Sequence, residues 1–171
     1  MGRVHYTQVE SIPEGEPVMM GMFSIAKHPS VMLFDSGASH TFINRTFVMK
    51  HQLPIEIVEH SFCIQFPRGY IYTKEMVCQI SIDLVGHIFP TNLLVLKNQD
   101  IDVILGMNWM CQHGAIIDTL CWTIQLDSPY DESKLLIHLP TPKRAVERVY
   151  GATVMEVKDI AVVREFLDVF P

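Results

Sequence analysis

Val31-Met-Leu-Phe-Asp35-Ser-Gly-Ala-Ser39 runs from a short apolar segment straight into an acid, a hydroxyl and a glycine. The apolar residues predict a buried strand, which would deliver the Asp35 carboxyl to its end. Gly37 permits a tight turn, and the Ser36 hydroxyl is able to donate to backbone across a neighbouring loop. By itself, Asp-Ser-Gly is also ordinary turn chemistry. The stretch indicates an active site only if a second feature supports it.

A second apolar segment, Asp102-Val-Ile-Leu-Gly106, also closes in a glycine. Alone it predicts a core strand followed by a turn. Together and in this order, the two segments resemble the aspartic protease family, in which an Asp-(Thr/Ser)-Gly loop rests on a strand that ends in apolar-apolar-Gly. The resemblance implies a catalytic loop (Asp35, Ser36, Gly37), substrate-binding neighbours (Ala38, Ser39) and a supporting strand end (Ile104, Leu105, Gly106).

Longer stretches of the sequence resemble one particular group of aspartic proteases. Two stretches are similar to the protease region of gypsy-class long-terminal-repeat retrotransposons. They are Leu33-Phe-Asp-Ser-Gly-Ala-Ser-His-Thr-Phe-Ile43 and Asp102-Val-Ile-Leu-Gly-Met-Asn-Trp109. Val162-Val-Arg-Glu-Phe-Leu-Asp-Val-Phe-Pro171 resembles the segment that leads into reverse transcriptase in those polyproteins. The resemblance implies an all-β, retropepsin-like barrel with one or two short helices, which processes its own polyprotein in cytoplasmic virus-like particles. The chain would then be a fragment or truncated copy of a longer reading frame.

The rest of the chain favours the same fold class. Short apolar runs between turn residues predict strands over 18–26, 31–34, 61–66, 71–84, 87–96, 102–105 and 122–126. Start signals at Asn44 and Gly106 predict short helices over 45–52 and 107–113. We expect a lead-in at 1–17, a protease domain at 18–127, and a linker with a helical or irregular tail at 128–171.

Composition argues against several classes of function. A formal charge of -6 without a basic stripe disfavours direct nucleic-acid binding. The sequence has no apolar run long enough to span a membrane and no signal peptide, which predicts an intracellular, cytoplasmic protein without membrane contact. Four scattered cysteines predict neither a disulfide framework nor a zinc site, and Cys111 with His113 supplies too few ligands. We expect no metal and no cofactor.

The proposed chemistry requires two copies of the chain. One carboxyl must take a proton from water while another, still protonated, polarises the scissile carbonyl. Two carboxyls about 3 Å apart share a single proton, because both cannot ionise comfortably. Since the sequence holds one Asp-Ser-Gly loop, the second Asp35 must come from a symmetry-related copy. We therefore expect a homodimer that acts on polypeptides, with greatest activity in mildly acid solution.

Proteases of this kind close a β-hairpin flap over the substrate. The turn Phe66-Pro-Arg-Gly-Tyr70 lies between two expected strands, which makes it the candidate here. An ordinary exposed hairpin is an equally good interpretation. The flap would present Arg68, Gly69, Tyr70 and Ile71 to the substrate.

The sequence departs from retroviral relatives beside both motifs. Those relatives often carry acids after the loop and an arginine after the supporting glycine, where this chain has Ser39, His40 and Met107. Met107 suggests apolar packing in place of an ion pair. His40 either contacts substrate or is an ordinary solvent-exposed histidine.

Two rival functions stay open at this point. A catalytically inactive or domesticated dimerisation module would keep the fold and lose cleavage. Alternatively, the chain is a piece of a polyprotein whose main activity is reverse transcription, although nothing in it resembles a polymerase acidic pair.

Overall fold

The computed structural model describes residues 18–66, 69–97 and 101–141. The expected lead-in and residues 142–171 of the expected tail lie outside these ranges. The elements of the described part are β1 (Met20–Ile25), β2 (His28–Phe34), β3 (Phe42–Asn44), α1 (Arg45–Lys50), β4 (Glu56–Phe66), β5 (Gly69–Leu84), β6 (His87–Leu96), β7 (Val103–Leu105), α2 (Met107–Gln112), β8 (Ile116–Asp118), β9 (Thr123–Asp127) and β10 (Lys134–His138). None of the described helices is long and apolar enough to cross a membrane.

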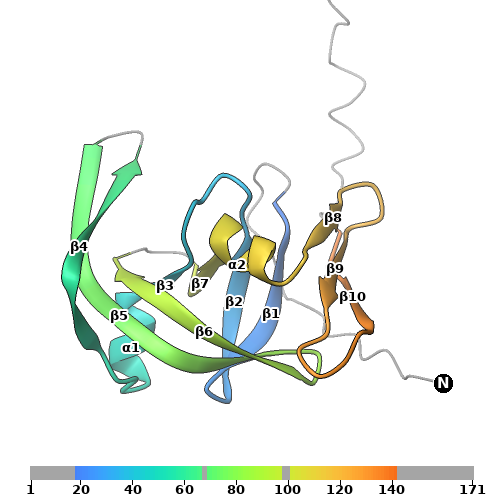
Figure 1. The fold of residues 1–171 in the computed structure, drawn as a ribbon, viewed down its shortest axis with the longest axis horizontal. Coiled ribbons are helices and arrows are strands. Elements are labelled where there is room, and N and C mark those ends of the chain that lie inside the picture. Colours follow the sequence, from blue (N-terminus) through green and yellow to red (C-terminus); the bar gives the residue numbers. More distant parts are fainter. Residues whose placement is uncertain (1–17, 67–68, 98–100, 142–171) are drawn as a thin grey trace, which may run out of the picture.

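Seven of the ten strands in the described part of the chain form one curved sheet. Its strand order is β1-β2-β7-β3-β6-β5-β4, and β1 also pairs with β5, so the sheet curls back on itself. The long strands β5 and β6 form the base of this curve, and the β4–β5 hairpin rises from one side of the body (Figure 1). A separate sheet of β10, β9 and β8 lies at the opposite side. The barrel therefore leaves its hairpin projecting beside the strand ends in the middle of the molecule.

The central strands are placed so that two loops emerge together. β2 and β7 pair in parallel, with Phe34 opposite Leu105, so both strands end at the same edge. Phe34 and Leu105 are buried, whereas Leu33 and Ile104 on the alternate face are only partly buried. The segments that follow, at Asp35 and Gly106, therefore start side by side.

Aromatic packing fixes α2 beneath these loops. The ring of Trp109 contacts Phe34 and Phe89, with centroids 6.4 and 5.5 Å away, and is 2% exposed. Its Nε1 donates to the Thr91 hydroxyl at 3.1 Å, which satisfies the polar atom of a buried indole. Helix α2 is too short to be stable by itself, so its packing against the core stabilises it.

The predicted elements agree largely with the structure. Both helices form inside their predicted ranges, and the Asn44 side chain caps α1 by accepting from the Thr46 N–H at 2.9 Å. Three short strands were missed: β3, β8 and β10. β10 pairs with β9 and buries Leu135 and Ile137, so ordered structure continues past the predicted boundary at residue 127. A proline-containing turn hid this alternating strand, which only its pairing with β9 establishes.

His113 follows α2 and packs its ring on core aromatics. The ring centroid lies 4.6 Å from that of Trp109 and 4.9 Å from that of Phe89. Its Nε2 is buried without a hydrogen-bond partner within the described ranges. Burial lowers the pKa of His113 below its ordinary value of 6.5, against an opposing influence of Asp127.

We expect the free energy of unfolding to fall as the pH drops from about 7 to about 5. In the unfolded chain, His113 takes up a proton at a pH near its ordinary pKa. In the folded chain it does so only at a lower pH. The unfolded state therefore binds more protons in this window and gains stability relative to the folded state. Urea denaturation at a series of pH values should give a flatter profile for His113→Phe. The exposed His138→Phe should keep the original slope, and equal slopes in all three proteins would contradict this assignment.

Candidate active site

Asp35 follows the end of β2, in a loop that hydrogen bonds to backbone groups hold in place. Its N–H donates to the Leu105 carbonyl at 3.0 Å, which ties the loop to β7. Its Oδ1 accepts from the Gly37 N–H at 2.8 Å, and its carbonyl accepts from the Ala38 N–H at 3.2 Å. The half-buried carboxyl is therefore held in one orientation by the turn that the sequence predicted.

The segment after β7 supports this loop from below. The Met107 N–H donates to the Ala38 carbonyl at 2.7 Å, and the Asn108 N–H donates to the Ser39 carbonyl at 3.3 Å. A Cβ added at Gly106 would lie 2.2 Å from the His40 carbonyl oxygen, so only glycine fits here. The structure thus brings the predicted catalytic loop and the predicted support, Ile104 to Gly106, into direct contact.

Two further residues that sequence reasoning missed connect the segments. Thr41 is 1% exposed, and its Oγ1 donates to Asn108 Oδ1 at 2.9 Å and accepts from the Gly106 N–H at 3.2 Å. A threonine preceding the apolar pair Phe42-Ile43 gave no sign of this role. Asn108 lies 67 residues along the chain, so only the fold could show that the two meet.

We expect Thr41→Val to destabilise the protein by about 1–3 kcal/mol, because it leaves the buried Gly106 N–H without its acceptor and removes the hydrogen bond to Asn108. Thr41→Ser keeps the hydroxyl and serves as the matched variant. Urea denaturation should place Thr41→Ser closer to the parent protein than Thr41→Val. The opposite order would show that the methyl group matters more than the hydrogen bonds.

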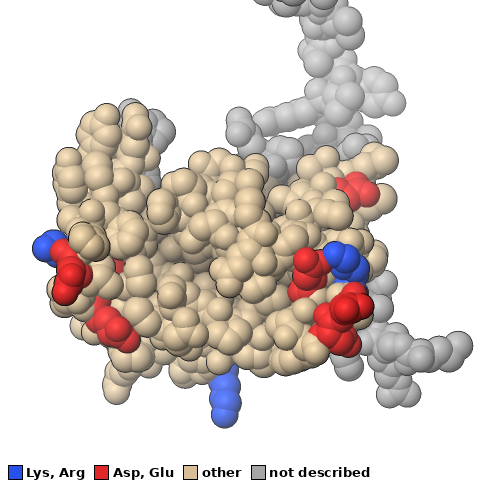
Figure 2. All heavy atoms as spheres, in the orientation of Figure 1, with Lys and Arg blue, Asp and Glu red and all other residues tan. Residues whose placement is uncertain are grey.

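A groove of about 650 Å³ opens beside the Asp35 loop. Figure 2 shows the surface hollowed between the β4–β5 hairpin and the body. Its walls come from the loop, β3, the hairpin and the ends of β6 and β7. It is lined by Asp35, Gly37, Ala38, Ser39, His40, Phe42, Ile43, Asn44, Cys63, Ile64, Gln65, Ile71, Leu96, Lys97, Ile101, Asp102 and Ile104. A hollow of this size beside a fixed carboxyl has room for several residues of an extended peptide.

The predicted flap residues form part of this hairpin. Phe66 of β4 pairs with Gly69 of β5, which has a φ of +139°. Ile71 lines the groove, whereas Tyr70 is 63% exposed and Gly69 does not line it. Arg68 lies outside the described residues. The hairpin therefore stands where a cover over the groove would stand, with exposed apolar side chains near its tip.

Ser36 and Met107 are both exposed beside the segments around Asp35. Ser36 is exposed, and its hydroxyl makes no hydrogen bond within the described part of the chain. Met107 is 39% exposed, so part of its side chain stays uncovered within a single chain. Both residues adjoin the segments that carry and support Asp35.

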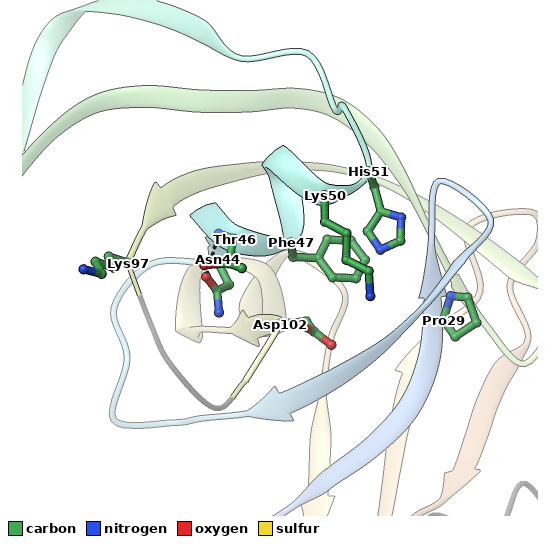
Figure 3. A pocket seen from close by; sticks show the side chains of 8 residues that line it. All are labelled: Pro29, Asn44, Thr46, Phe47, Lys50, His51, Lys97 and Asp102. Carbon is green, nitrogen blue, oxygen red and sulfur yellow. Dashed lines mark hydrogen bonds between the residues drawn. The ribbon is translucent and has the colours of Figure 1, made fainter.

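A second hollow of about 350 Å³ lies on the other side of Asn44, Lys97 and Asp102, which also line the groove. Lys50 and His51 of the α1 region stand across from Asp102 (Figure 3). Asp102 Oδ2 accepts from the Val31 N–H at 2.8 Å, so this carboxylate orders the strand before Asp35. The pKa of His51 is lowered mainly by desolvation, and further by His28 and Lys50, whereas Asp102 raises it. Without the Asp35 loop, this hollow is a weaker candidate for the catalytic site.

The described part of the chain has no cluster of side chains suited to binding a metal ion. No group of three or more His, Cys, Asp or Glu side chains there is arranged to hold an ion. Cys111 is exposed whereas the ring of His113 packs into the core.

The sequence matches the family described as retroviral aspartyl protease over residues 1–132. No curated protein matches it. Among solved structures, the fold is similar to the retroviral protease-like domain of Ddi1 from Leishmania major, with a TM-score of 0.56 and 15% identity over 75% of this chain and 97% of that one. It is also similar to EIAV protease complexed with the inhibitor HBY-793, with a TM-score of 0.51 and 18% identity over 63% and 99%. At these identities the likeness concerns the fold, and it confirms the predicted all-β, retropepsin-like class.

Proposed function

Because the chain belongs to the retroviral aspartyl protease family, we propose that it is an aspartic endopeptidase that cleaves polypeptides as a homodimer. The observation that carries this proposal is the fixed Asp35 carboxyl at the wall of a groove wide enough for a peptide. The loop occurs once per chain. A catalytic pair of carboxyls therefore needs a second copy.

The pair would work through one shared proton. The ionised Asp35 takes a proton from water as its oxygen attacks the scissile carbonyl carbon, and the protonated Asp35 of the partner subunit donates to the carbonyl oxygen. The tetrahedral intermediate then collapses as a proton passes to the amide nitrogen and the C–N bond breaks. Both carboxyls must be held in place throughout, which the bonds to Gly37 and Leu105 favour.

The surface around the loop supports a dimer. The Ser36 hydroxyl and the Met107 side chain are exposed beside Asp35 and its support. A copy related by a two-fold axis would offer these residues the same partners in return. Met107 would then find its apolar contacts between subunits, and Ser36 would donate across to the neighbouring loop.

We also propose that the natural substrate is a retrotransposon polyprotein containing this protease. The similarity of residues 33–43 and 102–109 to gypsy-class proteases supports that context. The segment 162–171, which resembles the approach to a reverse transcriptase, lies outside the described residues. In this setting the enzyme would act in cytoplasmic particles, and the pair of carboxyls would activate water without a metal or cofactor.

A dilution experiment tests the peptidase activity and the homodimer. Cleavage of an unstructured protein at about pH 5 should show a specific activity that rises with chain concentration, because dilution separates the dimer. Sedimentation over the same range should show mass shifting from one chain to two. Cleavage that rises steadily towards alkaline pH would contradict the shared-proton mechanism. A stable dimer without cleavage at any pH would favour the inactive interaction module.

A further inference from the structure

His40 lies in the groove wall a few residues beyond Asp35. It separates the active-site loop from β3 and lines the same hollow as the catalytic carboxyl. Its ring packs edge-on against Phe62 of β4, with centroids 5.8 Å apart and planes at 72°. The ring therefore bridges the loop and the hairpin, and its position is fixed from both sides.

The two ring nitrogens of His40 have different surroundings. Nδ1 lies 2.9 Å from the Ser39 hydroxyl oxygen, within hydrogen-bond distance. Nε2 has no hydrogen-bond partner in the described part of the chain, and the ring is partly exposed, so this atom is accessible. When Ser39 donates to Nδ1, or when the ring is protonated, Nε2 carries a hydrogen that it presents as a donor.

The other charged groups in the groove leave this donor available. The lining includes two carboxylates, one ammonium group and the Cys63 thiol besides His40. Asp102 accepts from the Val31 N–H and Asp35 from the Gly37 N–H, so each carboxylate already has a backbone partner. Lys97 adds positive charge to the same hollow. An anionic group that enters here would meet two nitrogen donors beside apolar walls.

We propose that His40 is a specificity-determining residue that selects a carboxylate side chain of the substrate close to the scissile bond. This inference rests on the proposed endopeptidase function and adds a preference to it. The imidazole donates from Nε2 to the substrate carboxylate, and a charged acceptor makes this hydrogen bond stronger than one to a neutral group.

The test uses matched peptides with Glu, Gln or Lys placed in turn at each position around one cleaved bond, assayed at about pH 5. At one position the parent enzyme should give a kcat/KM roughly tenfold higher for Glu than for Lys, as expected of one charge-assisted hydrogen bond. His40→Asp should reverse this ratio, and His40→Asn should bring it close to one. His60→Asp makes the same charge change on an exposed β4 residue outside the groove, and it should leave the ratio unchanged.

The possible failures are separable. If the parent enzyme cleaves none of the peptides or unstructured proteins, the proposed function fails. If it cleaves them with no charge preference, or if both His40 variants keep the parent ratio, only the role of His40 is overturned. Should His40→Asp be inactive, His40→Asn with an unaltered sedimentation mass decides the matter through its Glu-to-Lys ratio.

Discussion

Asp35→Asn is expected to abolish peptide cleavage and leave the fold intact. The amide oxygen of Asn can accept from the Gly37 N–H as Asp35 Oδ1 does at 2.8 Å, so the turn survives. An amide neither takes a proton from water nor shares one with a second carboxyl. Activity should therefore fall by roughly 10²–10⁴-fold or more. Assays on an unstructured protein, with denaturation curves for both proteins, measure the two halves of this expectation.

Mixing adds a sharper test, because the site is shared between subunits. If chains exchange freely, an equal mixture of parent and Asp35→Asn chains contains about one quarter parent dimers, and activity per parent chain falls to about half. A self-contained site in each chain would instead keep the full activity per parent chain.

The matched control is Asp131→Asn. Asp131 is exposed, and its Oδ1 also accepts a backbone N–H two residues ahead, from Ser133 at 3.0 Å. The substitution therefore repeats the same chemical change in the same kind of turn, far from the groove. Its variant should cleave at the parent rate. Undiminished cleavage by Asp35→Asn would refute the assignment of Asp35.

Gly106→Ala is expected to cause the largest loss of stability. The added Cβ would lie 2.2 Å from the His40 oxygen, 2.6 Å from the His40 carbonyl carbon and 2.8 Å from the Ala38 oxygen. All three are backbone atoms, which cannot rotate away as a side chain could. We expect a cost of about 3 kcal/mol or more, the upper range for overpacking. Because the clash pushes on the Asp35 loop itself, cleavage should also fall in whatever fraction stays folded.

Gly86→Ala separates this clash from the general cost of replacing a glycine. Gly86 has a φ of +86°, and a Cβ there would meet no atom within 4 Å. Its variant should lose only about 1 kcal/mol for the unfavourable backbone conformation. Thermal unfolding of both variants measures the difference. If Gly106→Ala were as mild as Gly86→Ala, the loop and its support could not be as closely interlocked as the structure has them.

The sequence by itself determined the features that depend on neighbouring residues. Apolar segments that run into Asp35 and Gly106 predicted two strand ends, because short apolar runs bounded by turn residues are typical of strands. Asn44 predicted the start of α1, since its side chain caps a donor two residues away. The turn between β4 and β5 followed from the local run of turn residues. In each case the deciding interactions lie within a few residues along the chain.

Tertiary structure decided what depends on distant partners. Thr41 and Asn108 became a support for the loop only when antiparallel pairing of β3 and β7 brought their segments together. β10 joined the fold through pairing with β9, which a boundary at residue 127 had left out. The ring of His40 packs against Phe62 from another strand, a contact that only the fold shows. Contacts of this kind leave no periodic trace in the sequence, because either partner alone is compatible with many surroundings.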